Sequence, residues 1–191
     1  KLFLSIASVL FLCASFYAVG YLKAELHEPR KVFEEDEFFV NAPEAIFTTC
    51  LLMFLMTMTL VITSQHFGLI WVAMEATTLV SAPLIYFHRH HRSLEATWKY
   101  LLICSVGIAV SLLGNFFLAI AASSSDGSSI QLMRNDLIAN ASQLLTPWMK
   151  VAFIFILVGY GTKMGLAPLH TWLPDAHSEA PSVVSALLSG T

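Results

Sequence analysis

Three ionisable residues, Glu75, Lys99 and Lys163, lie inside long apolar stretches of this sequence. A charged side chain at the centre of a bilayer costs roughly 2.5–3.5 kcal/mol on insertion scales, so such residues are candidates for function wherever the stretch crosses a membrane. Burial disfavours the charged form of a carboxyl or an amine, and a nearby opposite charge favours it. Groups held between these two influences exchange protons, so proton transfer is the chemistry that these residue types indicate.

Glu75 stands in GLIWVAMEATTLVSAPLIYF, nine residues after His66. That separation is about 13 Å of helix, which places the carboxyl near the middle of a membrane. The structural alternative is a neutral glutamate that only hydrogen-bonds a neighbouring helix, although glutamine would make such a bond at lower cost. We therefore interpret Glu75 as a proton-exchanging carboxyl.

Lys163 stands in VAFIFILVGYGTKMGLAPLHTWLP, thirteen residues or about 20 Å of helix after Lys150. Gly161, Gly165 and Pro168 surround it, and proline cannot donate the backbone hydrogen bond that a continuous helix needs. A broken helix at membrane depth is tolerated only where protein buries it or where it lines a water-filled cavity. Tight packing along the two glycines is the alternative, but it does not explain the lysine. The sequence predicts a helix interrupted between Gly161 and Pro168.

Lys99 and His170 are the other candidates for proton transfer. Lys99 follows the basic segment HRHHR by one or two helical turns, so snorkelling to the membrane surface is a serious alternative for it. His170 begins HTWLPDAHSEAP, whose spacing does not fit zinc ligands on a helix and fits a polar hinge better. We interpret the histidines of HRHHR as a solvated loop. We expect no catalytic residues and no metal site, because the sequence has no motif typical of either.

The composition is that of a membrane protein. Hydrophobic residues make up 57% and charged residues 12% of the 191 residues, with a mean hydropathy of +0.71. Soluble domains are about 45–50% apolar and about 25% charged. The net charge of −3 leaves no basic excess to neutralise phosphates. These values exclude a disordered chain, an ordinary soluble enzyme and a nucleic-acid-binding protein.

Runs of about 20 apolar residues cross membranes as helices. The sequence predicts five such spans and the beginning of a sixth, at residues 2–22, 42–63, 67–87, 94–122, 148–170 and 181–191. The expected fold class is all-α, a polytopic membrane helix bundle, with residues 1–191 forming a single fragment of a membrane domain. Both ends lie in or beside apolar runs, so we expect an internal piece of a longer protein.

The connections between the spans predict an orientation. The 23–41, 88–93 and 171–180 connections fall on one side and carry five lysines and arginines, against three on the other side. The positive-inside rule then places the 88–93 connection in the cytoplasm.

Two stretches, WVAMEATTLVSAPLIYF and GYGTKMGLAPLHTWLPDAHSEAPSVVSALLSG, resemble the antiporter-like membrane subunits of respiratory complex I, Mrp-type cation/proton antiporters and membrane-bound hydrogenases. Together with HRHHRSLEATWKYLLICSVGIAVSLLG, they are most similar to the hydrogenase-4 and formate hydrogenlyase branch. The resemblance implies about fourteen helices with inverted repeats, of which this chain would hold the third to the start of the eighth. It maps the family's carboxylate to Glu75, its broken-helix lysine to Lys163 and a lysine of its sixth helix to Lys99.

The resemblance also implies a function and partners. The chain would carry protons, or sodium ions, across the cell's inner (plasma) membrane within a redox-driven complex of the membrane-bound hydrogenase or NADH:quinone oxidoreductase type. The expected partners are the lipid bilayer, other membrane subunits and a peripheral hydrogenase or quinone-reductase arm, with no nucleic acid. We expect the chain to be a subunit of an oxidoreductase complex that carries no redox centre of its own. We expect no cofactor on it, because the sequence offers no Cys or His ligand set.

Two other functions remain open at the level of the sequence. One is a stand-alone Mrp-like cation/proton antiporter subunit, driven by an ion gradient. The other is a structural anchor for a peripheral enzyme, which would not need Glu75 and Lys163 at membrane depth. For transport we expect these two residues to form a breakable pair, in which each favours the charged form of the other.

Overall fold

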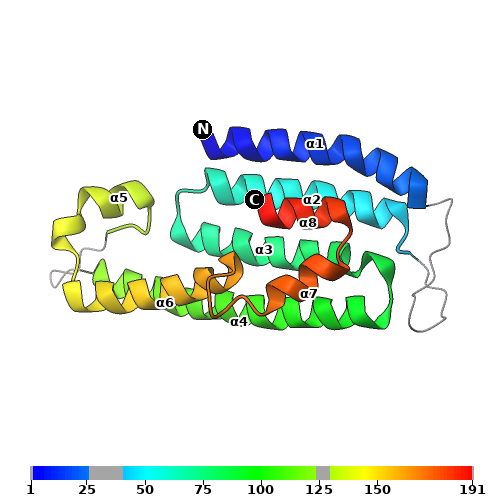
Figure 1. Cartoon of the computed structure of the whole chain (residues 1–191). Helices are drawn as coiled ribbons and strands as arrows, with labels where there is room; N and C mark the ends of the chain where they lie inside the picture. Colours follow the sequence, from blue (N-terminus) through cyan, green and yellow to red (C-terminus); the bar gives the residue numbers. More distant parts are fainter. Residues whose placement is uncertain (1, 26–40, 124–129, 191) are drawn as a thin grey trace.

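The computed structural model describes residues 2–25, 41–123 and 130–190, which are mostly helical (Figure 1). Within these ranges there is no β-strand beyond an isolated bridge between His66 and Met133. The all-α class predicted from the sequence is confirmed. In chain order the helices are α1 Leu2–Glu25, α2 Glu44–Thr63, α3 Phe67–Ile85, the 3₁₀ turn η1 Tyr86–His88, α4 His91–Ala121, α5 Arg134–Ala139, the 3₁₀ turn η2 Ala141–Gln143, α6 Thr146–Met164, α7 Trp172–Glu179 and α8 Ser182–Gly190.

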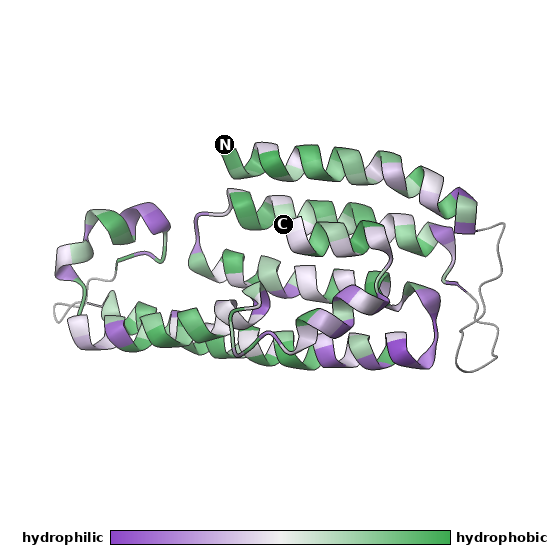
Figure 2. Cartoon of the chain, in the orientation of Figure 1, coloured by the Kyte–Doolittle hydropathy of each residue, from purple (hydrophilic) through white to green (hydrophobic). Residues whose placement is uncertain are grey.

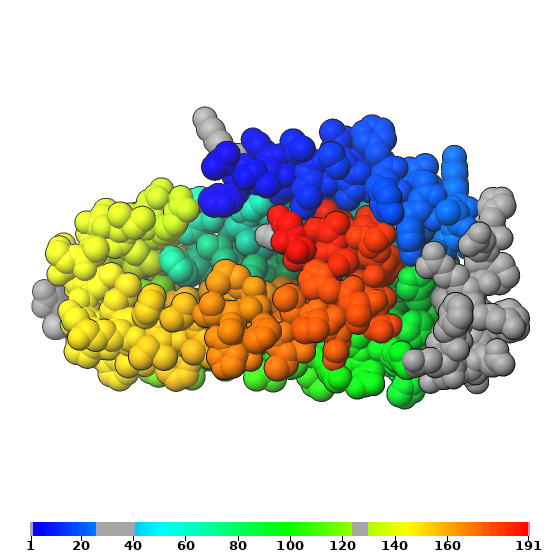
Figure 3. All heavy atoms as spheres, in the orientation of Figure 1, coloured from blue at the N-terminus to red at the C-terminus, as the bar shows by residue number. Residues whose placement is uncertain are grey.

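The long helices form one antiparallel bundle. Each of α2, α3 and α4 runs opposite to the helix before it, and α6 packs along α4 in the most extensive helix pair of the described chain (Figure 1). The short helix α7 also lies on α4, and α8 lies against α1, as the space-filling view shows on one face (Figure 3). The segment after α6 therefore folds back onto the bundle.

The outside of the bundle is apolar. Phe3 is 73% exposed and Phe16 is 75% exposed, and Figure 2 shows hydrophobic residues along the long helices and hydrophilic ones mainly near helix ends. Helices that are hydrophobic all round are typical of a lipid environment. Among the described residues, four helical segments are long and apolar enough to cross a membrane: 2–25, 44–63, 67–88 and 91–121.

The helix of the fifth predicted span, 148–170, ends inside that span. The helix ends at Met164, because Gly165 adopts a left-handed conformation with a φ of 77° that favours glycine. The interruption lies where the sequence predicts it, between Gly161 and Pro168. With two lysines in its nineteen residues, α6 is not among the four described segments that meet the length and hydropathy requirements of a membrane span.

The segment after the break is more regular than the sequence indicates. It forms the helix α7, in which Trp172 and Ala176 are buried. These two residues lie four apart and therefore share one face. The polar hinge predicted for this segment is instead a helix, which packs on α4 through this apolar face.

Glycines allow α4 and α6 to approach closely. A Cβ atom at Gly159 would lie 2.5 Å from the backbone nitrogen of Ser111, and one at Gly107 would lie 2.7 Å from the Cβ of Thr162. At Gly161, by contrast, an added Cβ would make only an ordinary contact at 3.4 Å. Gly159 and Gly107 thus form the tight contact, which brings the end of α6 against the middle of α4.

Candidate functional site

Lys163 lies in the last turn of α6, and its side chain reaches α3 and α4. Its Nζ donates a hydrogen bond to the hydroxyl of Thr78 at 2.9 Å and another to the hydroxyl of Tyr100 at 2.5 Å. The same nitrogen lies 4.7 Å from the centroid of the Tyr100 ring. Two hydroxyls and an aromatic face therefore hold this amine. None of the three groups carries a charge at neutral pH, so loss of the lysine proton leaves no uncompensated anion among them.

Glu75 lies on α3 and faces α4. Ser105 donates a hydrogen bond from its Oγ to Oε1 of Glu75 at 2.9 Å. The second carboxylate oxygen, Oε2, is buried and has no hydrogen-bond partner within the described part of the chain. An unpartnered charged oxygen is costly in an apolar interior, so Oε2 is the atom of this carboxyl that is left to accept a further hydrogen bond.

Glu75 and Lys163 lie close to each other but make no direct contact. No ion pair joins them within the ranges that the structure describes. Thr78, which accepts the hydrogen bond from Lys163, lies three residues after Glu75 on the same helix face. About one turn of α3, or about 5 Å along its axis, therefore separates the two groups. Their pairing during transport stays a prediction.

Tyr100 is the centre of the contacts around Lys163. It is fully buried, its hydroxyl is hydrogen-bonded to that of Ser81 at 2.7 Å, and its ring lies 5.1 Å from the ring of Trp172. Trp172 Nε1 donates to the carbonyl of Thr162 at 2.9 Å, at the end of α6. Through this tryptophan, α7 covers the broken end of α6 and fixes the position of Tyr100.

The residues that hold the two ionisable groups were not predicted from the sequence. These residues are Thr78, Ser81, Tyr100, Ser105 and Trp172. A signal was present, since hydroxyl side chains recur within otherwise apolar segments at helical spacing, three and six residues after Glu75. Such side chains usually bond the preceding turn of their own helix, so the spacing alone does not identify a site.

A cavity of about 560 Å³ adjoins Lys163. Its walls come from α2, α3, α4, α6, α7 and α8, and Tyr100, Tyr160, Lys163 and Trp172 are among its lining residues. The broken end of α6 thus lies beside an open volume, as expected for an interrupted helix at membrane depth.

Lys99 lies outside this site. Its Nζ is 2.8 Å from Oε1 of Glu95 and 2.8 Å from Oδ2 of Asp175, and the lysine side chain is 46% exposed. Successive residues of a helix point about 100° apart, so Tyr100 faces the core while its neighbour Lys99 faces outward. The structure gives Lys99 a surface ion-pair network with α7, and its predicted role in proton transfer is not supported by proximity to Glu75 or Lys163.

The remaining predicted site residues lie on the segment that leaves α6. His170 and Pro168 are exposed, whereas Gly161 is buried within α6. Gly165 adopts the left-handed conformation that ends α6, and its backbone N–H donates to carbonyls of the preceding turn. The structure does not bring His170 to the hydroxyl groups around Lys163, and the role of the hinge residues in transport stays a prediction.

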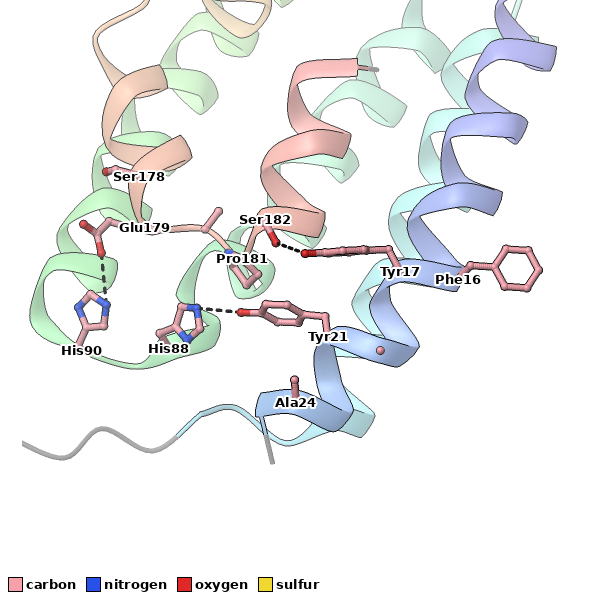
Figure 4. A pocket seen from close by; sticks show the side chains of 12 residues that line it. Phe16, Tyr17, Tyr21, Ala24, His88, His90, Ser178, Glu179, Pro181 and Ser182 are labelled. Atoms are coloured by element: carbon pink, nitrogen blue, oxygen red, sulfur yellow. Dashed lines mark hydrogen bonds and ion pairs between the residues drawn. The ribbon is translucent and has the colours of Figure 1, made fainter. Parts of the chain in front are cut away.

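A second cavity of about 890 Å³ opens where α1 ends and α4 begins (Figure 4). His88 lies 3.3 Å from the hydroxyl of Tyr21 and 3.7 Å from the carboxylate of Glu25, and His90 lies 3.3 Å from that of Glu179. The two histidine side chains are only 12% and 16% exposed. For these two residues the predicted solvated loop is wrong, because the ends of α1 and α7 converge on them, whereas His91 is exposed.

Within the described residues, no group of three or more His, Cys, Asp or Glu side chains is arranged to hold a metal ion. The three cysteines, Cys13, Cys50 and Cys104, are free thiols.

Residues 64–191 match the family described as NADH:quinone oxidoreductase/Mrp antiporter, TM. The chain belongs to this family and is a multi-pass membrane protein.

Within this family, the chain is similar in sequence to two relatives. The chain is 45% identical over 134 residues to the hydrogenase-4 component F homolog of Methylacidiphilum infernorum, covering 70% of this chain and 28% of that protein. It is 31% identical over 165 residues to NADH-quinone oxidoreductase subunit N of Azobacteroides pseudotrichonymphae, covering 86% of this chain and 31% of that protein. The chain thus spans less than a third of the length of these relatives. The resemblance inferred from the sequence is confirmed.

The fold also matches a chain of respiratory complex I from Thermus thermophilus with bound aureothin. The TM-score is 0.70 at 24% sequence identity, and the match covers 98% of this chain and 38% of that chain. This likeness establishes the arrangement of the helices.

Proposed function

We propose that this chain is part of a proton-translocating membrane subunit of a redox-driven complex, of the membrane-bound hydrogenase or NADH:quinone oxidoreductase type. One observation carries the proposal: the Lys163 amine, at the broken end of α6, is held by neutral hydroxyls one helical turn from the buried carboxyl of Glu75. Membership of the family and the likeness to a hydrogenase-4 component support it.

The proposed mechanism is a change of partner by Lys163. In one state the charged lysine approaches the unpartnered Oε2 of Glu75, and each group favours the charged form of the other. In the other state the lysine lies on Thr78 and Tyr100, where a proton is released more easily because no anion holds it. Glu75 then takes up a proton, because the positive charge of Lys163 no longer stabilises its carboxylate form. Alternation between the two states moves one proton past this point of the membrane.

The electron chemistry belongs to partner subunits in this proposal. A peripheral hydrogenase or quinone-reductase arm oxidises its substrate, and a charge change at the membrane displaces Lys163 and alters the proton affinities of both groups. Other membrane subunits complete the route, and the residues 1–191 act as one fragment of the translocating domain. The complex lies in the inner (plasma) membrane of the cell.

A second candidate function is a stand-alone cation/proton antiporter, because the matched family includes the Mrp antiporters. An antiporter subunit needs the same exchanging groups but takes its driving force from an ion gradient. A purely structural anchor is disfavoured, since it gives no reason for a buried carboxyl with an unpartnered oxygen.

The deciding experiment isolates the full-length protein with its native partners and reconstitutes it in proteoliposomes. Addition of the electron donor of the copurified enzyme should acidify or alkalinise the lumen, and an uncoupler should abolish that change. Transport that requires a sodium or proton gradient and ignores the electron donor would establish the antiporter instead. Absence of both activities in an intact complex would contradict the proposal.

A further inference from the structure

The short helix α7 contacts α4 through a polar edge as well as through its apolar face. Lys99 of α4 donates from Nζ to Oδ2 of Asp175 at 2.8 Å. One turn further along α7, the carboxylate of Glu179 lies 3.3 Å from Nε2 of His90, the residue that caps the start of α4 (Figure 4). Asp175 and Glu179 lie four residues apart and share one side of their helix. Two acidic side chains of α7 are therefore held by the beginning of α4.

The surroundings of the Lys99–Asp175 ion pair distinguish it from an ordinary surface pair. Exposed ion pairs in water usually contribute little to stability. Here Lys99 Nζ also lies 2.8 Å from Oε1 of Glu95, and the nearby side chains of Trp98 and Leu102 on α4 are 56% and 60% exposed. An apolar surface lowers the local dielectric, which strengthens the attraction between opposite charges. Loss of the lysine would leave two carboxylates without the cation that they share.

The turn of α7 that carries Asp175 also carries Trp172, three residues before it. Trp172 is 3% exposed, its ring lies 5.1 Å from that of Tyr100, and its Nε1 donates to the carbonyl of Thr162. Tyr100 directly follows Lys99 in α4. Two neighbouring residues of α4 thus contact two residues of a single turn of α7, so a displacement of Asp175 moves Trp172 with it.

The connections at the ends of α7 leave its position to these side-chain contacts. The helix has eight residues, and helices shorter than about 12–15 residues are marginal on their own. Before α7 the chain leaves α6 at Gly165, which is in the left-handed conformation. After α7, the extended residue Ala180 is followed by Pro181 and then by α8. Nδ1 of His177 and the hydroxyl of Ser185 on α8 are hydrogen-bonded at 2.6 Å. The helix α7 therefore lies between two irregular segments and is held in place by its side chains.

We propose that Lys99 and Asp175 are positioning residues of the Lys163 site. Their ion pair holds α7 on α4, and α7 in turn keeps Trp172 against Tyr100, which accepts a hydrogen bond from Lys163. The effect on transport rests on the proposed function, whereas the attachment of α7 does not. Without the ion pair, α7 moves away from α4 and the Tyr100 ring loses the contact with Trp172. Lys163 then lacks a fixed neutral partner, and transport slows.

A labelling experiment in the full-length complex tests the attachment of α7 without reference to transport. Ala176, on the apolar face of α7, is fully buried, and Ala176→Cys places a small thiol there. N-ethylmaleimide should modify this thiol about fivefold faster when Lys99→Met is added, the upper end of the effect expected for loss of an exposed ion pair. Mass spectrometry of the peptide that carries residue 176 measures the rate. Equal rates with and without Lys99→Met would overturn the proposal.

Transport by variants of the assembled complex tests the link to Lys163. Lys99→Met should slow electron-driven proton uptake by about fivefold as well. Asp175→Asn should slow it less, because Glu95 still neutralises the lysine. Lys99→Arg should keep the wild-type rate, since it retains the positive charge although an arginine does not release its proton. The exposed Lys150 supplies the matched control Lys150→Met, which should leave the rate unchanged.

Exchange of the two charges provides a rescue. Lys99→Asp alone brings a third carboxylate to Glu95 and Asp175, and it should transport more slowly than Lys99→Met. Addition of Asp175→Lys restores two carboxylates and one ammonium group, so the transport rate and the protection of the thiol at residue 176 should both return. A double variant as impaired as Lys99→Asp in both measurements would overturn an attachment through this ion pair.

The outcomes separate this inference from the proposed function. A wild-type complex that does not translocate protons contradicts the proposed function, while labelling at residue 176 still decides whether the ion pair holds α7. In a complex that pumps, slow transport by Lys99→Arg, or by Lys99→Met with the thiol still protected, would overturn the positioning role, because Lys99 would then act on protons directly. Faster labelling with wild-type transport would overturn the link to Lys163. If Lys99→Met fails to assemble, Asp175→Asn decides, because it keeps the size of the side chain.

Discussion

The Nζ of Lys163 lies 2.9 Å from the hydroxyl of Thr78, one helical turn from the carboxyl of Glu75. A hydroxyl accepts a hydrogen bond from either the charged or the neutral form of an amine, so this contact does not fix the charge of the lysine. A carboxylate would fix it. The distance of one turn therefore allows the lysine to leave its anion without losing hydrogen bonding.

Glu75→Gln should abolish or strongly slow proton transport in the full-length complex, because glutamine keeps the shape and the hydrogen bond to Ser105 but cannot exchange a proton. Glu75→Asp should retain part of the rate, since the carboxyl survives at shorter reach. Proton uptake by proteoliposomes at matched protein content measures both. The same change at the exposed Glu44, at the start of α2, is the control. Wild-type pumping by Glu75→Gln would reduce this residue to a packing role.

Lys163→Arg should transport poorly although it keeps a positive charge. Guanidinium does not release its proton in proteins, and its planar group does not fit the two hydroxyls that hold the lysine. The exposed Lys150, at the other end of α6, offers the matched control Lys150→Arg. Equal initial rates of proton uptake in both variants would show that Lys163 acts as a fixed charge.

Gly159→Ala should destabilise the bundle by about 1–3 kcal/mol, the usual range for overpacking. The added Cβ would lie 2.5 Å from a backbone nitrogen of α4, which cannot move away independently. Gly20→Ala provides the comparison, since nothing lies within 4 Å of its added Cβ. Thermal unfolding of the purified protein in detergent should show a lower midpoint for the first variant only.

Gly165→Ala should shift the end of α6 and lower stability by about 1–2 kcal/mol, the cost of a left-handed conformation for a residue with a side chain. Gly161→Ala, inside the helix, should be neutral or slightly stabilising because its added Cβ meets only a leucine side chain at 3.4 Å. The unfolding midpoint measures both effects. A Gly165→Ala variant as stable as wild type would mean that the break does not depend on this conformation.

Single cysteines at Arg92 and Gln143, in a chain otherwise free of cysteine, should react with a membrane-impermeant reagent from opposite sides of a sealed vesicle. The α4 helix and the connection after it separate the two positions. The excess of cations near the 88–93 connection predicts that Arg92 faces the cytoplasm. Reaction of both cysteines from the same side would contradict the topology.

Much of the architecture can be predicted from the sequence, and physical reasons explain which parts. Uninterrupted apolar runs can satisfy their backbone groups in lipid only as helices, which determines the all-α class and the first four spans. Gly165 and Pro168 determine the interruption of α6, because one favours a left-handed conformation and the other lacks an N–H group. Membrane depth alone identifies Glu75 and Lys163 as unusual residues.

Only the tertiary structure decides which residues meet. Helices that are apolar on every side have no hydrophobic face, so their periodicity cannot indicate which residues point inward. Lys99 and Tyr100 are neighbours in the sequence, and the packing of α4 sends the lysine outward and the tyrosine to Lys163. The same packing, set by close contacts between Gly107 and Gly159, places Tyr160 beside Asn115. The sequence thus determines which ionisable groups enter the membrane, and helix packing determines their partners.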